Sequence, residues 1–223
     1  MHFPIPYDGD DLMKKMLVRF VVNSILWGGV SFSNYSFADS GIFGIDHRLN
    51  KDDSGIWDRS NQLTLEYGSI AVILGLALWE GADTRLGKTM WKATDSMIMT
   101  AASSAATKEI FRRQRPADGN EPNAWFESGH NKSFVSGEVA NITSIITPVI
   151  LEYQDDYPMI WGLALLPIYD GVARMKSQAH WQSDVLAGAA LGAAIGYFAY
   201  NRDTPFLVSI LPGGLTVGFK KNF

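Results

Sequence analysis

Three short blocks of the sequence carry side chains that could bind and attack an anionic, oxygen-rich substrate. The first block gathers cations: Arg112 and Arg115 follow Lys108 by four and seven residues, so a helix would bring the three near one face. Pro116 disfavours helical geometry at Arg115, and we expect the helix to end there. Such cations either stabilise the C-terminus of a helix or clamp a phosphate-like oxyanion.

The second block, Ser133–Glu138, has Ser136 and Gly137 at the expected start of a helix. The serine hydroxyl and the first backbone amides of a helix can serve two purposes there. They can cap the helix, or they can bind an anion that docks against its N-terminus. The block by itself does not distinguish the two.

The third block combines a cation with a histidine–carboxylate pair. His180 and Asp184 are four residues apart, which puts them on one helical face if a helix begins near Gln178. A carboxylate beside an imidazole can keep one ring nitrogen protonated and leave the other free to attack an electrophile. Arg174 would add a positive charge beside the attacking nitrogen.

In order and spacing, the blocks resemble the signature of the type-2 phosphatidic acid phosphatase superfamily, which is related to the bacterial non-specific acid phosphatases and the vanadium haloperoxidases. The resemblance rests on Lys-x6-Arg-Pro, then Ser-Gly, then Arg-x5-His-x3-Asp, within residues 108–184. It implies a mechanism that needs no metal or other cofactor. A histidine attacks phosphorus, and water then hydrolyses the phosphohistidine.

Carried onto this sequence, the resemblance implies that His180 is the nucleophile and that Asp184 orients it. The residues expected to take part in catalysis are His180, Asp184, Glu138 and Arg174. The residues expected to bind the substrate phosphate are Lys108, Arg115, Ser136, Gly137 and Arg174. No metal-binding residue is expected.

The sequence departs from the family pattern at the general acid. The family usually reads Pro-Ser-Gly-His, with a histidine that protonates the leaving oxygen, whereas this chain reads Val135-Ser-Gly-Glu138. Ala173 also replaces a serine that usually precedes the third-block arginine. Four alternatives follow for the protonation of the leaving oxygen. Burial could keep Glu138 protonated so that it serves as the acid, or His130 could replace it. The leaving group could instead be that of a diphosphate, which needs little protonation, with ionised Glu138 acting as a base; or turnover could be lost.

We therefore expect a hydrolase, a metal-independent phosphatase that acts on a phosphomonoester or a diphosphate. The family suggests a lipid-linked substrate. Two alternatives stay open: a vanadate-dependent haloperoxidase, which shares the anion pocket, and a non-catalytic phosphate- or lipid-binding protein. The expected partners are a phosphorylated small molecule or lipid and a membrane surface, and the oligomeric state is left open.

The elements that must position these blocks are helices. Segments rich in Ala and Leu and poor in internal Pro span 61–80, 88–113, 136–152, 158–176 and 181–200. They predict an all-α bundle of five or six helices, within one domain over residues 39–223. Small residues between Ala187 and Gly196 would let a neighbouring helix approach closely. Leu207–Leu211 and Leu215–Phe219 flank a Pro-Gly-Gly turn and predict a short β-hairpin.

Composition excludes several classes of protein. A net charge of −4 offers no field for nucleic acid, so no nucleic-acid partner is expected. The absence of cysteine removes disulfides, thiolate metal sites and cysteine nucleophiles. The longest uncharged run in the domain, Val185–Asn201, falls short of a bilayer span. We therefore expect buried helices in a soluble or surface-bound protein.

The first 38 residues have the pattern of a secretory signal peptide. Three basic residues, the last of them Arg19, precede the uncharged run Phe20–Ala38, which ends in Ser-Phe-Ala. This order predicts cleavage after Ala38 and export to the periplasm. An amphipathic or core helix is the alternative.

Overall fold

The computed structural model describes residues 41, 44–128 and 132–203, and the backbone of two C-terminal strands, 207–211 and 214–218. The described residues belong to one unit of the chain, Ser36–Phe223. The predicted signal peptide, residues 1–38, lies outside the described residues, and so does His130.

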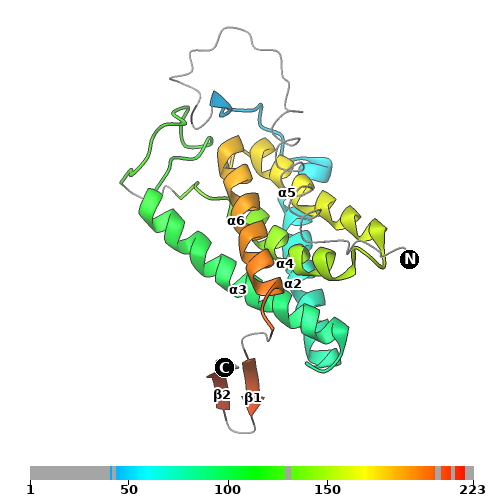
Figure 1. Cartoon of the computed structure of the whole chain (residues 1–223). Coiled ribbons are helices and arrows are strands. Elements are labelled where there is room, and N and C mark those ends of the chain that lie inside the picture. The colour runs from blue at the N-terminus through cyan, green and yellow to red at the C-terminus, as the bar shows by residue number, and fades with distance from the viewer. Residues whose placement is uncertain (1–40, 42–43, 129–131, 204–206, 212–213, 219–223) are drawn as a thin grey trace, which may run out of the picture. The chain divides into compact units, whose positions relative to one another are not determined.

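The prediction of an all-α fold is confirmed. The described part contains five α-helices and two short 3-10 helices (Figure 1): η3 (Gly55–Trp57), α2 (Arg59–Glu80), α3 (Arg85–Phe111), α4 (Gly137–Tyr153), η4 (Pro158–Ala164), α5 (Leu165–Lys176) and α6 (Gln182–Tyr200). Helix α4 packs against α2, α3, α5 and α6 and is therefore the centre of the bundle. The C-terminal hairpin pairs β1 (Leu207–Leu211) antiparallel with β2 (Gly214–Gly218).

Side-chain caps and a proline set several helix ends. The Asp58 carboxylate accepts from the backbone of Ser60 at 2.7 Å and begins α2, and the Thr84 hydroxyl accepts from Gly87 at 2.9 Å and begins α3. The helix predicted over residues 158–176 is instead divided into η4 and α5. Pro167 has no N–H to donate to a preceding turn, so it fits the first turn of a new helix better than the interior of a long one.

Glycines on one face of α6 let this helix touch the backbone of α4. A Cβ on Gly188 would lie 2.5 Å from the carbonyl oxygen of Ser136, and one on Gly192 would lie 2.2 Å from that of Ala140. Gly196 continues the same face towards Ser144. The close approach expected from the small residues is therefore present, and it carries the start of α6 to the start of α4.

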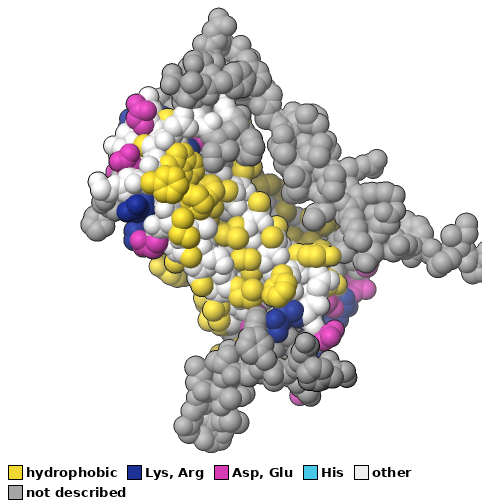
Figure 2. Space-filling view, turned by 60° about the vertical axis from the view of Figure 1, so that its left-hand side comes forward, with side chains coloured by type: hydrophobic (Ala, Val, Ile, Leu, Met, Phe, Trp, Pro, Cys, Tyr) yellow, Lys and Arg dark blue, Asp and Glu magenta, His cyan; other side chains and the backbone are white. Residues whose placement is uncertain are grey.

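Within the part of the chain that the structure describes, two helices, α2 and α6, are long and apolar enough to cross a membrane by length and composition alone. The buried residues of α2 are Gln62, Ile73 and Ala77, and its Trp79 is 86% exposed. The expectation that the apolar helices are buried is thus wrong for α2. Figure 2 shows a face on which hydrophobic side chains form a broad band, with charged side chains towards the two ends.

Candidate active site

The three blocks meet where α3 ends, α4 begins and the chain turns from α5 into α6. The amide of Ser136 donates to the carbonyl oxygen of Asp184 at 3.0 Å, which joins the second block to the third. A Cβ on Gly137 would lie 3.2 Å from Lys108 Nζ, so the ammonium group of the first block lies against the first turn of α4. His180 Nδ1 lies 3.8 Å from Asp184 Oδ2. Residues more than seventy positions apart in sequence therefore share one site.

His180 and Asp184 are brought together by a helix start and not by a shared helical face. The chain adopts a positive φ of 57° at Gln178, and α6 begins at Gln182, next to the predicted segment 181–200, so a helix starting near Gln178 that would put His180 and Asp184 on one face is not present. Asp184 lies in the first turn of α6, and its Oδ2 accepts from the amide of Trp181 at 2.9 Å. Because this hydrogen bond runs from Asp184 back to the residue that precedes α6, it holds the carboxylate on the side of His180.

The imidazole of His180 is buried and neutral. Its side chain is 2% exposed, and burial lowers its pKa to about 4, with the charges of Arg174 and Lys108 acting in the same direction and Asp184 opposing them. Nδ1 is the nitrogen that faces Asp184, and it makes no hydrogen bond within the described structure. Nε2 is therefore the ring nitrogen that faces away from this carboxylate.

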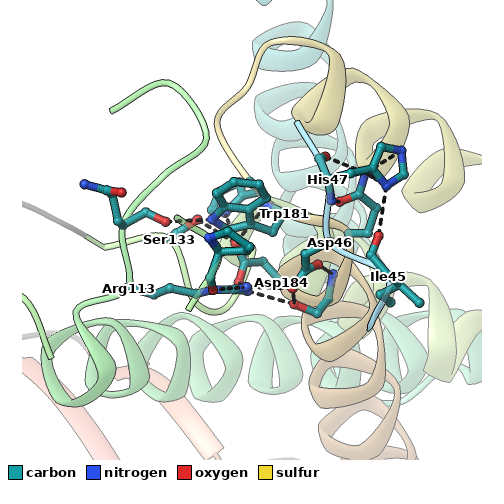
Figure 3. A network of polar contacts seen from close by, with 12 residues as sticks. Ile45, Asp46, His47, Arg113, Ser133, Trp181 and Asp184 are labelled. Carbon is teal, nitrogen blue, oxygen red and sulfur yellow. Dashed lines mark hydrogen bonds and ion pairs between the residues drawn. The ribbon is translucent and has the colours of Figure 1, made fainter. Parts of the chain in front are cut away.

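Asp184 is held by a buried network that the sequence analysis did not anticipate (Figure 3). Its Oδ2 accepts from the Ser133 hydroxyl at 2.5 Å, and its Oδ1 accepts from Arg113 Nη1 at 2.6 Å. Arg113 also donates through Nη2 to Asp46 at 2.6 Å. Burial acts to raise the pKa of Asp184, but His180, Arg113 and Ser133 outweigh it and the pKa is lowered. Asp184 is therefore a carboxylate at any pH near neutrality.

The end of α3 differs from the prediction and explains why Arg113 was missed. The helix stops at Phe111, and Arg112 adopts the left-handed conformation with φ 40°, so the three predicted cations do not share a helical face. Arg112 is exposed. Turning the chain at this point lets Arg113 reach the interior, where its guanidinium also lies 4.4 Å from the ring centre of Trp125. An additional arginine within the Lys-x6-Arg pattern, directly after Arg112, was the available signal.

Positive charge and unpartnered donors gather around the first turn of α4. Burial lowers the pKa of Lys108, and the neighbouring charges of Arg115 and Arg174 lower it further. The Ser136 hydroxyl is buried, does not cap α4, and has no hydrogen-bond partner among the described residues. Among those residues, no group of three or more His, Asp and Glu side chains could hold a metal ion. The arrangement suits an oxyanion held by cations, a hydroxyl and helix amides.

Glu138 is bound by two arginines. Arg59 on α2 donates to its two oxygens at 2.6 and 2.8 Å, and Arg174 Nη1 lies 3.6 Å from Oε2. Gln62 Oε1 accepts from both guanidinium groups, at 3.2 Å from Arg59 and 3.1 Å from Arg174. Burial acts to raise the pKa of Glu138, but Arg59 and Arg174 lower it below its ordinary value. Arg59 and Gln62 were not predicted because α2 carries none of the three blocks.

Asp170 is a further ionisable group close to these arginines. Its side chain is buried, and neither carboxyl oxygen has a hydrogen-bond partner within the described structure. Burial, followed by the charge of Glu138, raises its pKa to about 7 although Arg174 opposes the shift. The carboxyl group is therefore half-protonated near neutral pH.

Comparison with known proteins agrees with the motifs. A profile of the PAP2 superfamily matches residues 89–205, which contain all three blocks and more than half of the chain. Lipid A 1-phosphatase from Porphyromonas gingivalis is 30% identical over 124 residues, which cover 55% of this chain and 25% of that protein. A comparison with solved structures finds no significant match. The chain belongs to the PAP2 superfamily.

Proposed function

We propose that this protein is a metal-independent phosphatase that hydrolyses a lipid-linked phosphomonoester or diphosphate through a phosphohistidine. The observation that carries the proposal is the meeting of His180 and Asp184 with the unpartnered hydroxyl of Ser136 and the ammonium group of Lys108. A nucleophile without a site that binds the oxyanion, or such a site without a nucleophile, would not support turnover. Membership of the superfamily supports phosphatase activity at the general level.

In the first step, Nε2 of His180 attacks the phosphorus atom. The N–P bond forms as the bond from phosphorus to the leaving oxygen breaks, and the leaving group takes the electron pair. Nδ1 keeps its proton, and the positive charge that grows on the ring is stabilised by the carboxylate of Asp184. A neutral imidazole is required for this attack, and a pKa of about 4 keeps the ring neutral from mildly acidic pH upwards.

The cations act on the equatorial oxygens of the transferring phosphoryl group. Lys108, Arg115 and Arg174 neutralise charge there, and the Ser136 hydroxyl and the Gly137 amide donate to the same oxygens. Lys108 is held by α3, Ser136 and Gly137 by the start of α4, and Arg174 by α5, while Arg115 follows the end of α3, so little reorganisation is needed during the reaction. In the second step a water oxygen bonds to phosphorus, the N–P bond breaks, and inorganic phosphate leaves while His180 returns to its neutral form.

The protonation state of Glu138 indicates which kind of leaving group the site suits. A general acid must hold a proton, whereas the ion pairs with Arg59 and Arg174 favour the carboxylate. This argues against the acid role and favours a leaving group that needs little protonation. A diphosphate fits, because its leaving phosphate has a last pKa of about 6, far below that of an alkoxide. We therefore propose that diphosphates are preferred over monoesters, with ionised Glu138 holding Arg59 and Arg174 and accepting a proton from the attacking water.

The lipid-linked substrate and contact with a membrane are part of the same proposal. The relative from Porphyromonas gingivalis is named for a lipid substrate, and α2 exposes Tyr67, Val72, Leu78 and Trp79. Apolar side chains in such number on one helix can enter the edge of a bilayer, where a lipid-linked phosphate resides. We further propose that residues 1–38 direct export, so that residues 39–223 act in the periplasm; the N-terminal mass of the mature protein tests this.

Phosphate release from a panel of substrates tests the proposal. The panel contains a soluble monoester, a lipid monophosphate and a lipid diphosphate, each assayed with and without a chelator. We expect turnover that the chelator leaves unchanged, that His180→Ala abolishes, and that is accompanied by an acid-labile phosphoramidate in ³¹P NMR after rapid quenching. Full activity of His180→Ala would refute the nucleophile.

Two further assays separate the alternatives. Orthovanadate should inhibit a phosphatase, whereas bromide oxidation by the vanadate-loaded protein would identify a haloperoxidase. Phosphate binding without release from any substrate would identify a binding protein. His130→Ala addresses the other candidate acid, and we expect it to leave hydrolysis of the diphosphate unchanged.

A further inference from the structure

Residues 46–52 form a segment, here called the strap, that is bonded along its length to the turn carrying His180. The strap precedes the region matched by the family profile, which begins at residue 89. Its hydrogen bonds to this turn and to the start of α6 are made by backbone and side-chain groups on both sides, with donor–acceptor distances between 2.7 and 3.4 Å. The residues that it contacts in the turn and at the start of α6 are Lys176, Gln178, Gln182 and Ser183. His180 lies in the middle of this series.

Asp46 is the buried end of the strap. Its Oδ1 accepts from the amide of Ser183 at 2.8 Å, and its Oδ2 accepts from the Ser183 hydroxyl at 2.7 Å. The same Oδ2 accepts from Arg113 Nη2 at 2.6 Å, and the other terminal nitrogen of Arg113 donates to Asp184 (Figure 3). All three charged side chains, Asp46, Arg113 and Asp184, are 0% exposed.

The buried group formed by Asp46, Arg113 and Asp184 has more negative than positive charge, and this excess affects His180. One guanidinium is shared by two carboxylates, so the group carries one negative charge in excess. If Asp46 were uncharged, Arg113 would neutralise Asp184 alone and weaken its attraction for a positive ring at His180. With Asp46 present, Arg113 is shared and Asp184 keeps negative charge that faces Nδ1. Buried ion pairs add little net stability compared with apolar packing, so stability alone does not account for a third charged group.

We propose that Asp46 is a positioning residue of the active site: by sharing Arg113 and binding the first turn of α6, it keeps Asp184 oriented and charged towards His180. The proposal rests on the function proposed above and adds to it a residue from outside the matched family domain. Asp46 itself touches neither His180 nor the phosphate-binding groups. Its effect should therefore appear in the rate of the chemical step and not in substrate binding.

Steady-state kinetics of the full chain with three variants test this role. Asp46→Asn keeps the size of the side chain and removes its charge, and we expect kcat to fall on the order of 10- to 100-fold. KM and the dissociation constant of orthovanadate should stay within about twofold, because the phosphate-binding groups are untouched. Asp46→Glu restores the charge and should recover part of kcat. Asp53→Asn is the matched control, since this neighbouring carboxylate pairs with Lys51 on the surface, and its kinetics should equal those of wild type.

The outcomes separate this inference from the proposed function. Wild-type kcat in Asp46→Asn, with His180→Ala inactive, overturns the role of Asp46 alone. A full rate in His180→Ala overturns the function itself. Equal loss of kcat, vanadate affinity and melting temperature in both Asn and Glu variants shows a structural role and also overturns the inference. If Asp46→Asn does not melt cooperatively, Ser183→Ala replaces it, since it removes the hydroxyl between Asp46 and Arg113 but no charge. An unchanged kcat in that variant would then decide against the proposal.

Discussion

Titration of His180 gives the sharpest test of the site, because the structure makes an unusual prediction for it. An imidazole in water changes charge near pH 6.5. In this protein the ring of His180 is buried, and its pKa lies at about 4 because burial and the nearby charges of Arg174 and Lys108 outweigh the attraction of Asp184. Lowering the pH should therefore leave the proposed nucleophile neutral long after a free histidine would be charged.

The size of the effect follows from the shift. A change from 6.5 to about 4 corresponds to about 3 kcal/mol in favour of the neutral ring. At pH 5 about 90% of His180 would be neutral, compared with about 3% of an unperturbed imidazole. The acid limb of kcat/KM that reports this group should accordingly lie near pH 4.

Direct observation of the ring is the decisive assay. The chain contains 4 histidines, and the signal of His180 can be assigned as the one missing in His180→Ala. Its chemical shift is followed by NMR from pH 3.5 to 8 in the substrate-free protein. This avoids the phosphate group of the substrate, whose last ionisation near pH 6 would distort a kinetic profile.

A linked effect on stability provides a second measurement. Between about pH 4 and 6.5 the unfolded chain binds a proton at residue 180 that the folded chain does not bind. Stability should therefore fall as the pH is lowered through this window, and the part due to His180, up to about 3 kcal/mol, should be absent in His180→Ala. A ring that titrates between pH 6 and 7 in the folded protein would refute the argument, since it would mean that burial and the nearby cations do not outweigh the attraction of Asp184.

Three other changes test separate parts of the structure. Glu138→His returns a proton donor to the site, so the ratio of kcat/KM for monoesters to that for diphosphates should rise on the order of tenfold or more; an unchanged ratio contradicts the assignment of the leaving group. Asp170→Asn removes a buried carboxyl group whose pKa is raised to about 7. Because the folded chain binds this proton more tightly than the unfolded chain, the protonated group contributes stability that is fully present below about pH 4 and is lost as the pH rises through about 7. In chemical unfolding, the free energy of unfolding of the variant should therefore rise by up to about 4 kcal/mol relative to that of wild type between pH 4 and 8. A difference that does not change with pH would contradict the raised pKa of the buried carboxyl group. Gly188→Ala directs a methyl group at the carbonyl oxygen of Ser136, 2.5 Å from the ideal Cβ position. It should cost about 1–3 kcal/mol in unfolding free energy and reduce kcat, and wild-type values for both would show that α6 can move away from α4.

Several features of the fold could be predicted because they depend on neighbours in sequence. The ranges of α2, α4 and α6 agree with the predicted segments to within two residues, since apolar periodicity and the absence of proline act over a few turns. The small residues of α6 were recognised as a surface for close packing, and Gly188 and Gly192 do contact the backbone of α4. The exposure of α2 could not be predicted, because an apolar helix has the same composition whether other helices cover it or not.

The boundaries at the site were less predictable. The residue patterns suggested that the helix of the first block ends at Arg115. They also suggested that a helix starting near Gln178 could put His180 and Asp184 on one face, whereas the structure turns the chain at Arg112 and again at Gln178. Both turns depend on contacts made elsewhere. Phe111 and Arg112 accept backbone bonds from residues 126 and 127, and the turn at Gln178 is bonded to the strap. Local propensity contains no information about such partners.

The sequence by itself determined the family, the helical class and the types of residue that could handle a phosphate, because spacing in the chain preserves the motif whatever surrounds it. Only the tertiary structure decided the charge and partners of those residues. It buried His180 among cations, paired Glu138 with Arg59 from a distant helix, and joined Asp184 through Arg113 to Asp46. The physical reason is that protonation state depends on burial and on charges a few ångströms away in space, and residues 67 to 79 positions apart in the chain supply several of those charges.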